Sequence, residues 1–166
     1  MVVLVWWAVG YAFAYGTCGD GPFIGHSNFF LSQTKYQTTS FYAHWLYTLF
    51  FCATSNAIVH GALSERMKFG AYIVYTVMLS GWVYPVIVHW TWSLDGWLSA
   101  YRVPNCSTGI REPLLSNSNG VMDFAGSGSV HMVGGTTALW GALVLGAWCR
   151  SAVVHMVVIH GHGAWL

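Results

Sequence analysis

Asp123 and His131 are the two ionisable residues of an apolar stretch that is long enough to cross a membrane. If this stretch is one helix, a spacing of four residues joins Asp123, Ser127, His131 and Gly135 into a slowly turning stripe. An ionisable group inside an apolar span is costly, and such groups usually face a bundle interior or an ion pathway. The spacing therefore predicts a membrane protein in which this stripe borders a polar path.

The composition is that of a membrane chain. Of the 166 residues, 55% are hydrophobic and only 7% are charged, whereas a soluble domain carries roughly 25% charged residues. The formal net charge is +1 and the Lys and Arg residues are scattered, which argues against a nucleic-acid partner. The cysteines include no CxxC pair, so no zinc site or disulfide framework is indicated. We expect an all-α integral membrane protein in which Cys52 and Cys149 are packing residues.

We expect a single domain, residues 1–166, in which polar stretches separate four apolar spans. The expected spans are residues 1–16, 41–64, 69–92 and 122–148, the loops are 17–40 and 93–121, and the tail is 150–166. The first span is short for a hydrocarbon core that needs about 20 helical residues. Pro85 lies inside the third span, which we expect to be kinked or interrupted there.

Small residues recur every four positions in two of the spans, a pattern that lets membrane helices approach closely. The pattern comprises Ala53, Ala57 and Gly61 in the second span, and Gly134, Ala138, Ala142 and Gly146 in the fourth. We therefore expect both helices to be packed against neighbours. In the tail, His155, His160 and His162 have no Cys, Asp or Glu among them, so we expect no metal site and no other cofactor.

The orientation in the membrane follows from the loops, and the two ends of the chain are read from its terminal apolar runs. Lys and Arg are shared equally between the two sides, so the positive-inside rule does not decide. Asn105-Cys106-Ser107 is an N-glycosylation acceptor pattern, which makes Asn105 a glycosylation candidate and would place loop 93–121 outside. The first apolar run lacks the basic region of a signal peptide, and the tail ends within an apolar run, so we expect a chain that is cut at both ends.

Four motifs in order resemble the ammonium transporter family, in its eukaryotic branch. They are Gly10-Tyr-Ala-Phe-Ala-Tyr-Gly16, Gly61-Ala-Leu-Ser-Glu-Arg66, Tyr84-Pro-Val-Ile-Val-His-Trp-Thr-Trp92 and Asp123-Phe-Ala-Gly-Ser-Gly-Ser-Val-His131. The resemblance implies a fold of about eleven helices in two inverted repeats, assembled as a homotrimer in the plasma membrane. The chain would supply about the second to fifth helices, and inverted-repeat transporters place their pathway between the repeats.

The resemblance also implies roles for five residues, each with a simpler alternative. His131 resembles the first pore histidine; the alternative is an interhelical hydrogen bond. Asp123 resembles an aspartate of the outer vestibule, and could also cap a helix. Trp92 resembles a vestibule tryptophan that attracts ammonium by a cation–π interaction, where the alternative is an interfacial belt. Phe51 resembles a gating phenylalanine and Tyr47 lies one turn earlier on the same face; both could be packing residues.

These roles imply a transporter rather than an enzyme, with ammonium or ammonia as substrate and membrane lipid as surroundings. Ammonium would be recruited near Trp92 and Asp123, lose water past Phe51 and be conducted past His131. One alternative is a truncated fragment that does not transport by itself. Another is a membrane haem-binding electron carrier, since four histidines lie in apolar spans and imidazole is a common axial ligand: His44, His60, His89 and His131.

Overall fold

The computed structural model describes residues 1–17, 19–32, 39–103 and 120–146, and the regular elements of these residues are helices. In chain order they are α1 (Val2–Val5), η1 (Trp6–Gly10), α2 (Tyr11–Tyr15), η2 (Phe29–Leu31), α3 (Thr39–Leu63), α4 (Phe69–Met78), η4 (Leu79–Val83), α5 (Tyr84–Trp92), η5 (Ser127–Met132) and α6 (Val133–Leu145). The elements η1, η4 and η5 are π-helical turns, and η2 is a 3₁₀ turn.

Three of the resulting helical runs are long and apolar enough to cross a membrane: Thr39–Leu63, Phe69–Trp92 and Ser127–Leu145. The first run, Val2–Tyr15, is apolar but shorter. The prediction of an all-α integral membrane protein is therefore confirmed. The last run begins at Ser127 rather than near Met122, because Gly126 adopts a left-handed backbone with φ of 83° that a continuing helix does not use.

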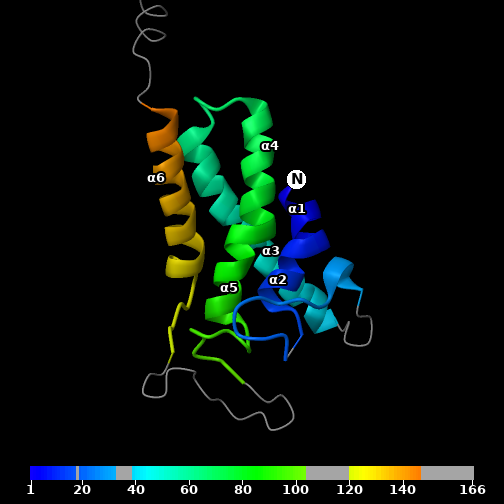
Figure 1. Cartoon of the computed structure of the whole chain (residues 1–166). Coiled ribbons are helices and arrows are strands. Elements are labelled where there is room, and N and C mark those ends of the chain that lie inside the picture. The colour runs from blue at the N-terminus through cyan, green and yellow to red at the C-terminus, as the bar shows by residue number, and fades with distance from the viewer. Residues whose placement is uncertain (18, 33–38, 104–119, 147–166) are drawn as a thin grey trace, which may run out of the picture.

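Helix α3 lies at the centre of the packing, with α6 against it, while α2 packs against α5 (Figure 1). The turn between α3 and α4 lies at one end of the bundle. The segment that follows α5 and the segment that leads into η5 lie together at the opposite end. Trp92 and Asp123, which are 31 residues apart in the chain, therefore meet at the same end of the bundle.

The third span was expected to be kinked or interrupted near Pro85, and it is not interrupted, because the helical run continues from Phe69 through Trp92. Proline lacks the N–H that would bond one turn back, and its ring crowds that turn. A π-helical turn, Leu79–Val83, comes directly before Pro85. Its wider hydrogen-bonding pattern accommodates the hydrogen bond that the proline cannot make. Pro85 itself is fully buried, so the proline is a packed part of the span.

The bundle interior combines apolar rings with a few paired polar side chains. The rings of Trp6 and Tyr84 are buried with centroids 5.7 Å apart. Cys52 is fully buried, which confirms it as a packing residue. Next to it, the Asn56 side-chain amide donates to Ser80 Oγ at 3.0 Å and to the Cys52 carbonyl at 2.9 Å. A membrane interior offers no water to such groups, so this pairing ties α3 to η4.

One of the two small-residue faces is packed as the sequence predicted. Gly134 and Ala138 of α6 are buried, and a β-carbon at Gly134 would lie 3.0 Å from the backbone oxygen of Ser55 in α3. Helix α3 is packed as well, but among the described residues its Ala57 and Gly61 are exposed, so this small-residue face is not the one in contact. Helix α3 instead turns the face that carries Ser55 towards its neighbours, so α6 approaches α3 over a different stripe.

The loop after α2 is organised by a single carboxylate. Asp20 Oδ2 accepts hydrogen bonds from the backbone N–H groups of Thr17, His26 and Ser27, and from the Ser27 hydroxyl. Burial alone raises the pKa of Asp20, but these bonds and the nearby His26 outweigh it and hold the pKa below its usual range. Asp20 therefore stays ionised and fixes the loop beside the ends of α2 and α5.

Candidate functional site

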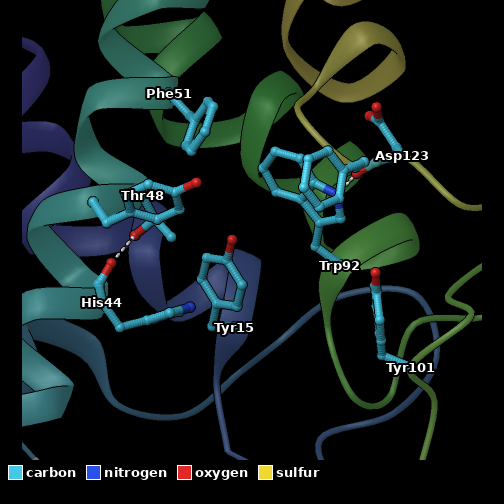
Figure 2. Close-up of a pocket in the computed structure, with 9 residues that line it drawn as sticks. Tyr15, His44, Thr48, Phe51, Trp92, Tyr101 and Asp123 are labelled. Atoms are coloured by element: carbon cyan, nitrogen blue, oxygen red, sulfur yellow. Dashed lines mark hydrogen bonds between the residues drawn. The ribbon is translucent and has the colours of Figure 1, made fainter.

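A pocket of about 190 Å³ opens at the end of the bundle where α5 stops (Figure 2). It contains four of the five residues that the sequence selected: Tyr47, Phe51, Trp92 and Asp123. Five further residues complete the wall, namely Tyr15, His44, Thr48, Tyr101 and Phe124. The pocket is thus built by α2, α3, the end of α5, the segment after α5 and the segment before η5.

Aromatic rings form one side of this pocket. The rings of Tyr47 and Phe51 meet edge to face with centroids 4.8 Å apart, and Phe51 meets Trp92 in the same way at 5.4 Å. The Trp92 indole N–H donates to the main-chain carbonyl of Asp123 at 2.7 Å, which fixes the orientation of the ring. Aromatic faces attract cations electrostatically, so a small cation fits this wall.

A second pocket, of about 390 Å³, adjoins the first and includes the ends of the helices. The two pockets share Tyr15, His44 and Trp92 as common wall. Asp95 lines the second pocket, is buried, and accepts a hydrogen bond from the Gly19 N–H at 2.8 Å. We call the first the inner chamber and the second the outer chamber. We call the two chambers together the vestibule; its walls include several aromatic rings and the residues Asp95 and Asp123.

Asp123 does not lie on the helix, so its predicted place in a helical stripe with Ser127 and His131 is wrong. Its carboxylate instead caps η5: Oδ2 accepts from the N–H groups of Gly128 at 3.2 Å and Ser129 at 2.7 Å, and from the Ser129 hydroxyl at 2.7 Å. Burial alone raises the pKa of Asp123, but the bonds from Ser129, Gly128 and Ser127 outweigh it and hold the pKa below its usual range. The charge of Asp123 therefore persists beside the inner chamber.

His131 is not a wall residue of the inner or the outer chamber. It lies in η5 with an exposed side chain, and its Nδ1 is 3.1 Å from the Gly126 carbonyl oxygen. A carbonyl can only accept, so this contact assigns a proton to Nδ1 and leaves the Nε2 lone pair free of that role. The structure thus separates His131 from the four residues that it brings together.

The sequence did not assign five of the wall residues to this pocket, although His44 was named as a possible haem ligand: Tyr15, His44, Thr48, Tyr101 and Phe124. His44 and Thr48 lie on the helix face that also carries Tyr47 and Phe51, at spacings of three, four and seven residues. Extending that face by one turn would have found them. Tyr15 and Tyr101 reach the pocket through tertiary packing of α2 and of the segment after α5, for which the local pattern offers no signal.

One of the four histidines of the haem alternative, His89, cannot bind iron. Both nitrogens of His89 lie 2.9 Å from carbonyl oxygens, Nδ1 from that of Ala14 and Nε2 from that of Gly21. A ring held in this way has no nitrogen available for iron. Within the described ranges, no group of three or more metal-ligating side chains gathers. The glycosylation candidate Asn105, and the tail histidines and Cys149, lie outside the described residues.

Comparison of the sequence with known proteins identifies its family. The profile of the Ammonium Transporter Family matches residues 1–163. A putative ammonium transporter 1 member 5 of Arabidopsis thaliana is 42% identical over 98% of this chain, and ammonium transporter 1 member 1 of Oryza sativa subsp. japonica is 46% identical over 86%. These alignments cover 31% and 27% of the relatives, so the chain spans less than a third of their length. No solved structure matches the chain significantly. The chain belongs to the ammonium transporter family.

Proposed function

We propose that this chain contributes the capture vestibule and part of the conduction path of a channel-type ammonium or ammonia transporter, which acts as a homotrimer in the plasma membrane. The observation that carries the proposal is the gathering of Tyr47, Phe51, Trp92 and Asp123 around one pocket in a chain of this family. The relatives are named as ammonium transporters, and none of those names describes an enzyme.

Capture follows from the charges and rings of the vestibule. The Asp123 carboxylate stays ionised beside the inner chamber and adds negative potential for an entering cation. The indole face of Trp92 contributes a cation–π attraction of about 0.5–2 kcal/mol. The rings of Tyr47 and Phe51 narrow the chamber on its other side. A cation can shed water there only because aromatic faces replace part of its hydration.

Conduction is assigned to His131. Its Nδ1 proton is directed to the Gly126 carbonyl, which leaves Nε2 as an acceptor for a hydrogen bond or a proton from ammonium. Potassium ion carries no proton and cannot enter this exchange. The assignment therefore accounts for selectivity by chemistry rather than by size alone, and it separates capture at Trp92 from transfer at His131.

The test compares Trp92→Leu with His131→Ala in the full product of the gene, expressed in cells that lack their own ammonium transporters. Uptake of labelled methylammonium should show a KM raised roughly 2- to 30-fold for Trp92→Leu, from the loss of about 0.5–2 kcal/mol. His131→Ala should abolish transport or change its selectivity over potassium.

Trp90→Leu is the matched control, because Trp90 is on the same helix but does not line either chamber; its indole donates to the Phe23 carbonyl. We expect Trp90→Leu to leave the KM close to that of the parent protein. A well-folded His131→Ala protein with unchanged flux and unchanged selectivity would contradict the conduction assignment. An unchanged KM in Trp92→Leu would contradict the capture assignment.

A further inference from the structure

His44 lies in the wall between the inner and outer chambers and lines both of them. Its ring meets the ring of Tyr15 edge to face, with centroids 4.8 Å apart and planes at 80°. Figure 2 shows the His44 ring beside Tyr15, on the opposite side of the inner chamber from Trp92 and Asp123. A cation in either chamber would therefore lie beside an imidazole.

One nitrogen of this imidazole is already used. His44 Nδ1 lies 3.0 Å from the hydroxyl of Tyr11, which is buried in α2. The Tyr11 ring is held by edge contacts with Trp6 at 6.1 Å and with Phe41 at 5.7 Å, so its hydroxyl is a fixed partner. In the described part of the chain, Nε2 of His44 has no hydrogen-bond partner. The free nitrogen of a chamber-wall histidine is thus available to a ligand.

The Tyr11 hydroxyl allows the ring to present that nitrogen as an acceptor. A hydroxyl both donates and accepts, so Tyr11 is compatible with the His44 proton on Nδ1 or on Nε2. An ammonium ion in the chamber favours the form with the proton on Nδ1, because that form offers an acceptor lone pair on Nε2 to one of its N–H groups. Binding and choice of tautomer are therefore linked through one buried contact.

Thr48 supplies a second acceptor one helical turn further along the same face of α3. Its hydroxyl proton is directed to the backbone carbonyls of His44 at 2.9 Å and Trp45 at 3.0 Å. The hydroxyl has a single proton, so towards the inner chamber, which Thr48 lines, its oxygen can only accept. His44 and Thr48 thus offer two acceptors to an ion that carries several N–H groups.

We propose that His44 Nε2 and Thr48 Oγ1 form a binding subsite of the vestibule for ammonium and small primary alkylammonium ions. The subsite rests on the proposed function, and adds directional hydrogen-bond acceptors to the aromatic and carboxylate wall opposite. It distinguishes ions of equal charge, because ammonium and methylammonium donate N–H bonds and potassium ion does not. Tyr11 is a positioning residue that acts through the His44 ring.

The first test uses methylammonium uptake by the full gene product. His44→Leu and Thr48→Val remove the acceptors and should each raise the KM, by about tenfold for a lost hydrogen bond to a charged ligand. His44→Gln and Thr48→Ser keep an acceptor at the same place and should return the KM towards the parent value. His60→Leu is the control, since His60 lies on the same helix but lines a different pocket.

The second test does not require transport. Nitrogen-15 labelled protein is purified, the His44 signals are assigned with His44→Gln, and ammonium chloride is compared with potassium chloride at constant pH. Ammonium, but not potassium, should move His44 towards the form with its proton on Nδ1, and Tyr11→Phe should weaken this response.

The Trp92 indole N–H signal separates the possible outcomes. If ammonium moves the Trp92 signal but leaves His44 unchanged, the subsite is refuted while the proposed capture at Trp92 stands. If neither signal responds to ammonium, the vestibule does not take this ion, and the capture step and the subsite are both refuted. A KM for His44→Leu equal to that of His60→Leu would also overturn the subsite.

Discussion

Replacing Gly134 by alanine tests the contact between α6 and α3. A β-carbon at Gly134 would lie 3.0 Å from the Ser55 backbone oxygen and 3.1 Å from Cβ of Ile58. The Ser55 oxygen belongs to the backbone of a long helix and cannot retreat as a side-chain end could. Overpacking of this kind costs about 1–3 kcal/mol, whereas replacing glycine by alanine inside a helix gains about 1 kcal/mol. The clash should therefore cancel or exceed the gain.

Gly135→Ala provides the matched control, because a β-carbon there meets nothing within 4 Å among the described residues. Both variants gain the same helix propensity, so the difference between them isolates packing, and Gly134→Ala should be less stable by about 1–3 kcal/mol. Denaturant titration of the purified protein in detergent micelles, followed by far-ultraviolet circular dichroism, measures both free energies of unfolding. Equal stability of the two variants would show that α3 and α6 do not approach closely at Gly134.

Three further outcomes are expected. Asp123→Asn removes the charge from the cap of η5 and should lower the free energy of unfolding by about 0.5–2 kcal/mol, measured by the same titration. Because the pKa of Asp20 is lowered in the folded protein, its contribution to stability is complete above its ordinary pKa of 3.8 and is lost as the pH falls below it. Asp20→Asn should therefore flatten the acid limb of thermal unfolding. In a glycosylating membrane system, Asn105→Gln should remove one glycan band, and labelling of Glu65 from that same side would refute the proposed topology.

The helical architecture could be predicted because a bilayer leaves few choices. A chain that is 55% hydrophobic must satisfy its backbone groups in lipid, and long apolar helices do so within one segment. The aromatic side of the pocket could also be predicted from the sequence, since Tyr47 and Phe51 share a helix face. The position of Asp123 could not be predicted, because it depends on single residues. Gly126 prevents the helix from extending back to Asp123, and the Asp123 carboxylate binds the free N–H groups of η5.

The role of His44 was hidden for a different reason. The spacing of α3 places His44 on the face of Phe51, but the partner that orients its ring is Tyr11, 33 residues earlier in the chain. Such a contact exists only after α2 has packed beside α3, so no local pattern reports it. The same holds for Trp92 and Asp123, whose hydrogen bond joins the end of α5 to the segment before η5, 31 residues later in the chain.

That last hydrogen bond links the two halves of the proposed mechanism. The Trp92 indole is anchored on the main chain of Asp123, while the Asp123 carboxylate holds the first turn of η5, the element that carries His131. Asp123 therefore orients the Trp92 ring, to which capture is assigned, and also fixes the start of η5, which carries His131. A change at the Trp92 ring should act on capture alone, because the cap remains. A change at the Asp123 carboxylate acts on the cap and on the potential of the chamber together, so KM and maximal rate should change in concert.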